Sequence, residues 1–337
     1  MVVMKEKKSQ RVKISKIESR QRLFDHTPRD KKMVFENPTL QLISKGRLVG
    51  VWKNTQPLYF YPFSLLDFVP GKRRHIELRL IAANRKIARR EILRLRNAKV
   101  YFEEVDMDLM SVAREKGHKV SVICNLDDIN KSNAKALSCV DLLIVRVGSD
   151  SMDLSALEGI PNSRLLSGVR IYLSPNNNSR LSGVIKRARE IGMDFAHISK
   201  RLIDSSQVYL NEKEKRAIHR LTKLQTDTFR VILPKDTSKV FNEKFEISDD
   251  YGNSRACYFS RHREVISSDR FYPCYTKSVI SSGRLSSSTL DGLRKKSRLF
   301  GKTCSDCACI YENDILESIV KTTNAIDGKF VLEYKEY

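Results

Sequence analysis

Patterns typical of buried strands alternate with patterns typical of amphipathic helices along the middle of this chain. The predicted strands are residues 75–83, 118–125, 140–148, 168–178, 193–199 and 229–235, and the predicted helices are residues 84–98, 108–117, 129–139, 182–192 and 212–224. A strand–helix–strand order at this spacing is typical of βαβ units with parallel strands. We therefore predict an α/β fold whose parallel sheet curves into a partial barrel.

The alternation does not extend over the whole chain, which indicates three parts. We predict a basic N-terminal arm at residues 1–35, a partial α/β barrel at residues 36–240, and a Cys-rich domain with the C-terminal tail at residues 241–337. Short strands are predicted at residues 39–44 and 47–52, ahead of the main alternation. The arm either becomes ordered on a partner or remains a solvated tail.

The chain carries a large excess of positive charge. Its 62 lysines and arginines outnumber its 40 aspartates and glutamates, for a formal charge of +22. Such an excess favours a polyanionic partner, and we expect nucleic acid, a ribonucleoprotein or a polymerase, with a protein partner or simple solubility as alternatives. No apolar run is long enough to span a bilayer, and the first residues lack the apolar core of a secretory signal. We expect no membrane partner and a reducing, cytoplasmic environment.

Five of the seven cysteines lie between residues 257 and 309, in polar surroundings. The predicted metal ligands are Cys257, Cys274, Cys304 and Cys307, with Cys309 as a spare or as an alternative to Cys307. Four thiolates can hold a structural zinc ion or a [4Fe–4S] cluster, whereas packing as small apolar side chains is the ordinary alternative. The other two cysteines, Cys124 and Cys139, are predicted to pack in the core.

Several short stretches together resemble the radical S-adenosylmethionine superfamily with a C-terminal SPASM or twitch domain. These stretches are HKVSVICN at 118–125, VDLLIVRVGSDS at 140–151, GVRIYLSPNNN at 168–178, SSDRFYPC at 267–274 and the closing TCSDC at 303–307. The resemblance covers residues 76–312. It implies a partial (β/α) barrel of radical-SAM type followed by a small Cys-rich metal-binding domain. It also implies one auxiliary [4Fe–4S] cluster, with zinc as the alternative.

The catalytic motif of that superfamily is missing here. The resemblance places a C-x-x-x-C-x-x-C motif after the first barrel strand, where this chain has Ala83, Ile87 and Arg90, none of which supplies a thiolate. The Gly-Gly-Glu-Pro stretch expected near Val100 is also absent. We therefore expect no bound S-adenosylmethionine, no catalytic residues and a non-catalytic role. The alternative is a radical-SAM-family enzyme, or a partner of one, that modifies a peptide or a nucleotide.

Basic residues replace the missing motif and recur near the last cysteines. Lys86, Arg89, Arg90 and Arg94 share one face of the predicted helix, and few acidic residues are close in sequence. Such a face either contacts phosphates or is simply solvated. The predicted nucleic-acid-binding residues are Arg73, Arg74, Arg85, Lys86, Arg89, Arg90, Arg94, Arg294, Lys295, Lys296 and Arg298.

Overall fold

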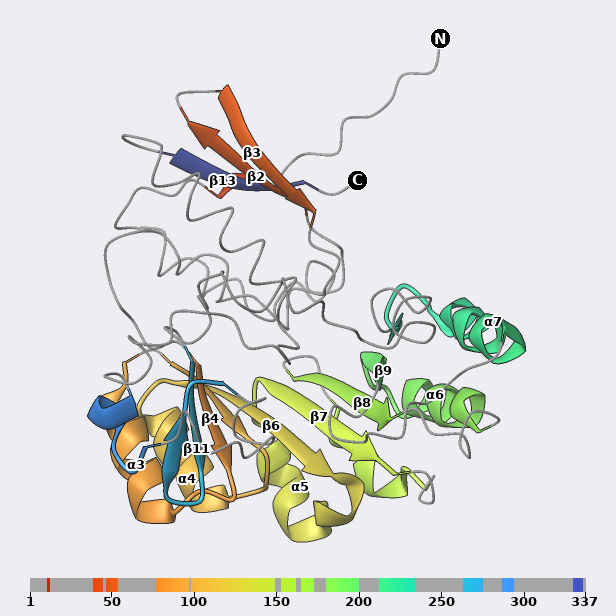
Figure 1. Cartoon of the computed structure of the whole chain (residues 1–337). Coiled ribbons are helices and arrows are strands. Elements are labelled where there is room, and N and C mark those ends of the chain that lie inside the picture. The colour runs from red at the N-terminus through yellow and green to blue at the C-terminus, as the bar shows by residue number, and fades with distance from the viewer. Residues whose placement is uncertain are drawn as a thin grey trace. The chain divides into compact units, whose positions relative to one another are not determined.

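A computed structural model describes twelve segments of the chain. They are residues 11–12, 39–44, 47–53, 77–96, 98–148, 153–161, 165–172, 180–199, 212–233, 263–274, 287–293 and 330–335. The chain divides into two compact units, one formed by residues 1–74 with 309–337 and the other by residues 75–308 (Figure 1). Each unit contains its own sheet.

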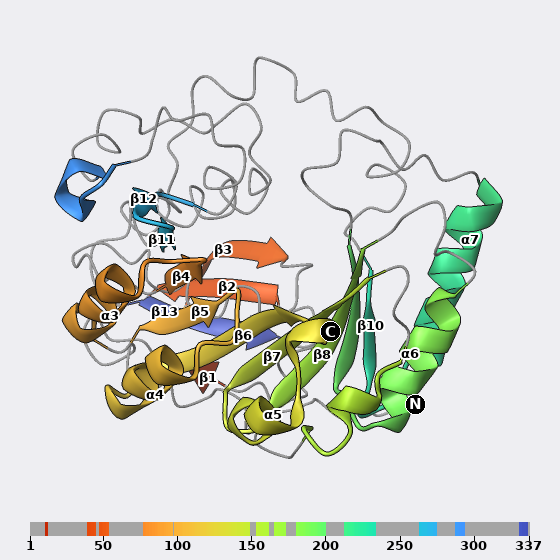
Figure 2. The ribbon, with the colours of Figure 1, turned by 90° about the horizontal axis from the view of Figure 1, so that it is seen from below.

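The larger unit is built on a nine-stranded sheet. Its strands are β4 (Glu77–Ile81), β5 (Lys99–Phe102), β6 (Lys119–Asn125), β7 (Leu142–Val147), β8 (Leu166–Tyr172), β9 (Phe195–Ser199), β10 (Arg230–Ile232), β11 (Arg263–Ser267) and β12 (Arg270–Tyr272). They are arranged in the order β10-β9-β8-β7-β6-β5-β4-β11-β12. All neighbouring strands are parallel except β11 and β12, which form an antiparallel pair. The strands turn progressively from β4 to β10 (Figure 2). The predicted α/β class and parallel sheet are confirmed.

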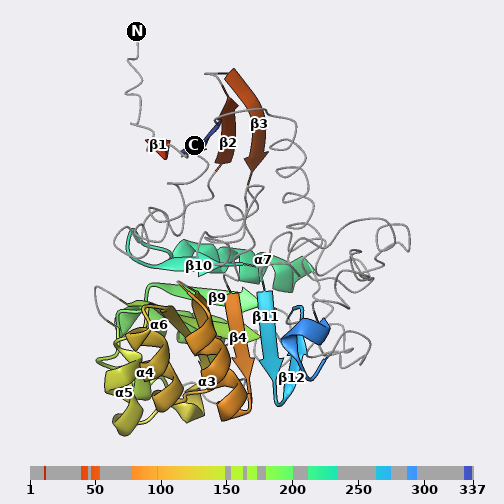
Figure 3. The ribbon, with the colours of Figure 1, turned by 90° about the vertical axis from the view of Figure 1, so that its left-hand side faces the viewer.

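Helices follow most of the parallel strands. They are α3 (Arg85–Arg94), α4 (Met107–Glu115), α5 (Lys131–Leu137), α6 (Leu181–Glu190) and α7 (Glu212–Arg220), and the 3₁₀ turns are η2 (Leu126–Asp128), η3 (Ser155–Leu157) and η4 (Leu221–Leu224). Asn84, Asp106 and Asn130 each accept backbone N–H groups at the start of α3, α4 and α5, which satisfies donors that a helix leaves open. Figure 3 shows α3, α4, α5 and α6 together on one side of the sheet.

Alternate residues of the strands pack against these helices and form the core. On β4 and β5, for example, the core residues are Leu78, Leu80, Val100 and Phe102. Side chains of successive strand residues point to opposite faces of a sheet, so the intervening residues lie on the other face. We call this second face, opposite α3–α6, the inner face.

The inner face has an apolar layer and a polar layer. Ile123, Ile144, Gly168 and Phe195 are neighbours in register on β6 to β9, and all are buried. The ring of Phe195 fills the space beside Gly168 that any larger side chain would need: a Cβ at this position would lie 2.4 Å from the ring carbons. The polar residues of this face are described with the candidate site.

The smaller unit contains a four-stranded antiparallel sheet. Its order is β1 (Arg11–Val12), β13 (Phe330–Lys335), β2 (Thr39–Ser44) and β3 (Arg47–Lys53). The strands predicted at residues 39–44 and 47–52 are confirmed as β2 and β3. Because β13 pairs with both β1 and β2, segments from the two ends of the chain share one sheet.

Three features differ from the sequence-based expectations. The short strand β5 was not predicted, because it has only four residues and begins with a lysine at the end of a basic run. β11 lies inside the predicted domain 241–337, yet it pairs with β4 in the larger sheet. Cys124 is buried in β6 as predicted, but Cys139 is exposed after the end of α5, so its core assignment was wrong. The predicted domain boundaries stay predictions.

Among the described residues, no helix is both long enough and apolar enough to cross a membrane.

Candidate anion-binding surfaces

Helix α3 carries five of the predicted nucleic-acid-binding residues. The Asn84 side chain accepts the backbone N–H groups of Lys86 and Ile87, at 3.1 and 3.4 Å, which fixes where the helix begins. One face of the helix buries Ala88, Glu91 and Ile92 against the core, which directs the basic side chains toward the opposite face.

Three of the five cations are paired with carboxylates. Arg85 contacts Asp106 at 3.0 Å and Asp108 at 2.6 Å, beside the start of α4. Arg90 contacts Glu91 at 3.1 Å.

Arg94 links two buried carboxylates that lie far apart in the sequence. It contacts Glu91 on its own helix and Glu264 of β11, the latter at 2.8 Å. The two glutamate side chains are only 4% and 2% exposed, so Arg94 compensates charges that water cannot reach. The expected lack of acidic partners was therefore wrong for Arg85, Arg90 and Arg94. Glu91 of the same helix contacts Arg90 and Arg94, and the fold supplies the more distant partners Asp106, Asp108 and Glu264.

Lys86 and Arg89 remain as exposed cations on α3. Across the described part of the larger unit, neither forms an ion pair, and the same holds for Arg96 just after the helix. Lys86 and Arg89 lie three residues apart, which places them one turn apart on the same face. We call these two residues the α3 pair.

A second basic surface lies on the inner face of the sheet, where the sequence analysis did not place one. At its base, Arg263 of β11 contacts Glu77 of β4 at 3.2 Å. Burial raises the pKa of the Glu77 carboxyl, but the Arg263 and Arg79 cations outweigh burial and hold that pKa below its ordinary value. The Arg79 guanidinium and the Lys99 ammonium also lie 5.0 and 4.7 Å from the centre of the Tyr101 ring.

Glu103 connects this base to the carboxyl ends of the strands. Its buried carboxylate lies 3.5 Å from Arg79 of β4 and also contacts Arg146 of β7. One carboxylate thus contacts two arginines from different strands. Ser121, on the strand between them, is fully buried, and its hydroxyl has no hydrogen-bond partner in the described structure.

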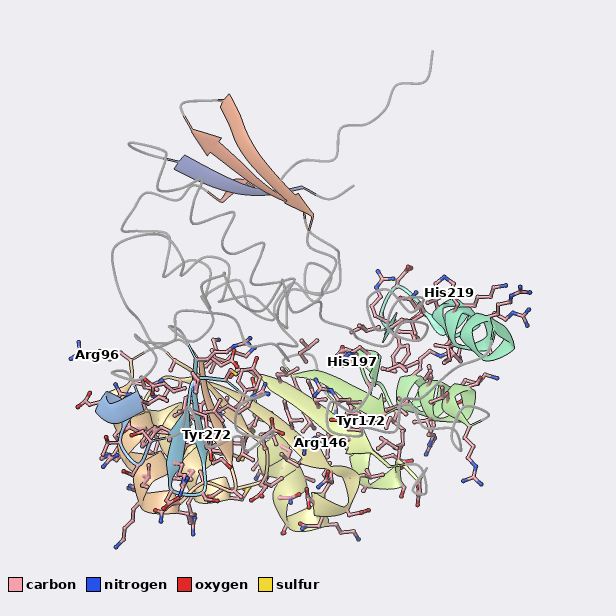
Figure 4. The ribbon with its side chains drawn as sticks, viewed as in Figure 1. Arg96, Arg146, Tyr172, His197, His219 and Tyr272 are labelled. Atoms are coloured by element: carbon pink, nitrogen blue, oxygen red, sulfur yellow. The ribbon has the colours of Figure 1, made fainter. Side chains whose placement is uncertain are left out.

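A row of polar residues crosses the inner face above the apolar layer. Asn125, Arg146, Arg170 and His197 are register neighbours on β6, β7, β8 and β9. The Arg170 Nε–H donates to His197 Nδ1 at 3.3 Å. Figure 4 shows Arg146 and His197 on this part of the sheet, together with Tyr172 near the end of β8. We call Arg146, Arg170 and His197 the arginine row.

His197 is neutral and has a defined tautomer. Burial, and after it the neighbouring Arg170 cation, lowers the pKa of His197 well below its ordinary value. Because an arginine is always protonated, Nδ1 of the ring must accept the hydrogen bond from Arg170, which leaves the proton on Nε2. His197 therefore does not offset the charge of Arg170.

Most of the predicted metal ligands lie outside the described residues. These are Cys257, Cys304, Cys307 and Cys309, and the predicted basic residues Arg73, Arg74, Arg294, Lys295, Lys296 and Arg298 lie outside as well. Cys274 is half-buried two residues after the end of β12. Within the described segments, no group of three or more histidines, cysteines, aspartates or glutamates is placed to bind a metal. The four-cysteine site therefore stays a prediction.

The residues at the positions of the missing catalytic motif do not fit an iron–sulfur cluster. Ala83 and Ile87 pack partly buried against the hydrophobic core, and Arg90 is engaged by Glu91. None of the three supplies a thiolate, which is the ligand that such clusters require.

Comparisons with solved structures include a distant similarity. The chain resembles the crystal structure of SuiB from Streptococcus suis, a radical S-adenosylmethionine enzyme, with a TM-score of 0.43 and 10% sequence identity. The similarity covers 62% of this chain and 62% of SuiB, less than two thirds of either. No protein-family model and no curated protein matches the chain. A similarity this distant carries no conclusion about function.

Proposed function

We propose that this chain is a non-catalytic nucleic-acid-binding protein, or a component of a nucleic-acid machine such as a polymerase or a ribosome. The observation that carries the proposal is the α3 pair: two exposed cations one helical turn apart, without carboxylate partners among the described residues, in a chain of charge +22. When exposed lysines and arginines contact the phosphates of a nucleic acid, they displace the counterions condensed on it. This release of counterions is the main source of non-specific affinity for nucleic acid.

The non-catalytic part of the proposal is supported by the residues around α3. Ala83, Ile87 and Arg90 cannot hold a catalytic cluster, and the neighbouring arginines are engaged in ion pairs within the fold. In this proposal Cys257, Cys274, Cys304 and Cys307 hold one structural [4Fe–4S] cluster, or zinc, with Cys309 as the spare. Such a site stabilises an irregular region because metal binding and folding are coupled.

Reversing the charge of the α3 pair tests the binding surface. The variant Lys86→Glu/Arg89→Glu is expected to bind a labelled single-stranded oligonucleotide of about twenty nucleotides at least about tenfold more weakly than the unaltered protein. Its salt dependence is expected to be shallower by about one contact for each lysine or arginine that is lost. Fluorescence anisotropy over a range of salt concentrations measures both quantities.

A matched control comes from α5, which exposes Lys131 and Lys135 four residues apart. The variant Lys131→Glu/Lys135→Glu makes the same change in net charge on another helix. If both variants lose the same affinity, the net charge of the chain explains binding and the α3 pair has no special role. If neither loses affinity, α3 is not a nucleic-acid-binding surface.

A further inference from the structure

We infer that helices α6 and α7 carry a second nucleic-acid-binding surface, which contacts the phosphate backbone and is separate from the α3 pair. Its members are exposed lysines and arginines: Lys186 and Arg189 on α6, Arg216 and Arg220 on α7, and Lys223 in η4. We call these five residues the α6–α7 strip. The inference rests on the proposed function for the class of its ligand, but it concerns a different surface.

The packing of α7 directs three of these cations to one side. Ile218 and Leu221 are buried in the core, which leaves the opposite side of the helix exposed to solvent. Arg216 and Arg220 are four residues apart, so they lie one turn apart on that exposed side. Lys223 follows three residues later in a 3₁₀ turn, where side chains at this spacing lie above one another. These three cations therefore form a continuous row.

Helix α6 extends the row. Lys186 and Arg189 are three residues apart and exposed, whereas the side of α6 that contains Val184, Ile185 and Ala188 is buried. The Arg189 guanidinium donates a hydrogen bond to the backbone carbonyl of Leu224 at 3.4 Å, directly after Lys223. This bond joins the cations of α6 to the end of the row and leaves the charge of Arg189 uncompensated, because a carbonyl carries no net charge.

The strip concentrates positive charge. None of its members forms an ion pair with any residue that the structure describes, including Asp227, the exposed carboxylate that follows η4. Arg187 of α6 differs, because it contacts Glu158 and lies 3.6 Å from Glu190. Like charges one turn apart on a helix repel and weaken it. A polyanion bound along the strip removes this repulsion, and each phosphate contact releases counterions.

The residue types of the strip favour a nucleic-acid backbone over an acidic protein. The centre of a protein–protein interface is rich in aromatic and other apolar side chains. Helices α6 and α7 and the turn η4 contain no Phe, Tyr or Trp, and none of their described residues is an exposed large apolar side chain. Without an aromatic ring to stack on bases, the strip contacts phosphates and does not read sequence.

The strip and the α3 pair lie near opposite ends of the larger sheet. Helix α3 follows β4, whereas α7 lies between β9 and β10 in the chain (Figure 2). Five strand spacings of about 4.8 Å separate β4 from β9, which is about 24 Å along the sheet. Substitutions in the two surfaces are therefore expected to act independently.

The variant Arg216→Glu/Arg220→Glu tests the strip in the full-length chain. We expect it to bind a labelled single-stranded oligonucleotide of about twenty nucleotides at least about fivefold more weakly than the unaltered protein. The loss is expected to be the same for an all-thymidine and a mixed sequence, because backbone contacts carry no sequence information. Lys131→Glu/Lys135→Glu on α5 makes the same change in net charge and is expected to lose less. A loss no larger than that of this control overturns the inference.

Two further measurements locate the contact and identify the ligand. The oligonucleotide is expected to protect Lys186 and Lys223 from acetylation, measured by mass spectrometry, and to leave Lys131 reactive; equal reactivity of all three with and without oligonucleotide overturns the inference. If polyglutamate of equal charge displaces the oligonucleotide as well as an unlabelled oligonucleotide does, the strip fits an acidic protein and the inference falls. Should the glutamate variant fold poorly, Arg216→Gln/Arg220→Gln replaces it, with a smaller loss expected in the same direction.

The outcomes separate this inference from the proposed role of the α3 pair. If only Lys86→Glu/Arg89→Glu weakens binding beyond the α5 control, the α3 pair binds nucleic acid and the strip does not. If only Arg216→Glu/Arg220→Glu does so, the strip is the binding surface and the role of the α3 pair is refuted. If both do, the fold-losses are expected to multiply in the combined variant, because the two surfaces are far apart.

Discussion

Replacing Arg94 by methionine is expected to destabilise the larger unit by about 3 kcal/mol, the lower end of the range for breaking a buried ion pair from one side. The substitution removes the cation between Glu91 and Glu264, two nearly inaccessible carboxylates on α3 and β11. We expect a loss of stability near the lower end of that range because Glu91 keeps a cationic partner, Arg90, in the variant. The destabilised contact is the one between strand β11 and helix α3.

Urea unfolding followed by far-ultraviolet circular dichroism measures this effect. Tryptophan fluorescence is unsuitable, because the single tryptophan, Trp52, lies on β3 in the smaller unit. Arg89→Met is the matched control: the same change five residues before Arg94, at an exposed position, is expected to stay within about 0.5 kcal/mol. Arg94→Met combined with Glu264→Gln is expected to be more stable than Arg94→Met alone, because the unpaired charge is also removed. Equal stability of Arg94→Met and the control would contradict the role of Arg94.

Replacing Cys304 and Cys307 together by alanine is expected to remove the metal completely. Metal analysis after anaerobic purification should fall from about four irons, or about one zinc ion, per chain to nearly none. The melting temperature should fall as well, because a structural metal contributes directly to folding. Cys139→Ala is the control, since Cys139 is exposed after α5 and belongs to no predicted ligand set.

The same preparation also tests the non-catalytic proposal. If the unaltered protein contains neither iron nor zinc, or if the double variant keeps its metal, the four-cysteine site is refuted. If anaerobic reduction with S-adenosylmethionine yields 5′-deoxyadenosine, the chain is an enzyme, and the expectation drawn from Ala83, Ile87 and Arg90 fails.

The order of strands and helices was readable from the sequence because each element follows a local rule. Apolar runs such as Leu142–Val147 identify buried strands, and the polar residues Asn84, Asp106 and Asn130 mark the helix starts. Strand β11 was missed because its partner β4 lies far earlier in the chain: Arg263 pairs with Glu77, 186 positions before it. A local pattern carries no information about such a pairing.

The ion pairs that Arg85 and Arg94 of α3 form with distant carboxylates were not predicted, for the same reason. The Glu264 that engages Arg94 is 170 residues away in the sequence, and the partners of Arg85 lie beyond the next strand. Counting charges near a helix in the sequence therefore overestimated how many of its arginines were available to bind phosphates.

The sequence carries a signal of the arginine row. Arg146, Arg170 and His197 each lie within a largely apolar strand: LLIVRV, LSGVRIY and FAHIS. Only the register between β7, β8 and β9 shows that they form one row.

The central claim is that this protein binds nucleic acid through its excess of basic residues. Its most direct test is the affinity of the unaltered chain for a labelled single-stranded oligonucleotide, measured at several salt concentrations. The logarithm of the association constant is expected to fall linearly with the logarithm of the salt concentration, by about 0.7 for each phosphate contact, with a total slope of about −3 or steeper. Absence of binding at low salt, or an affinity that salt does not change, would contradict the claim.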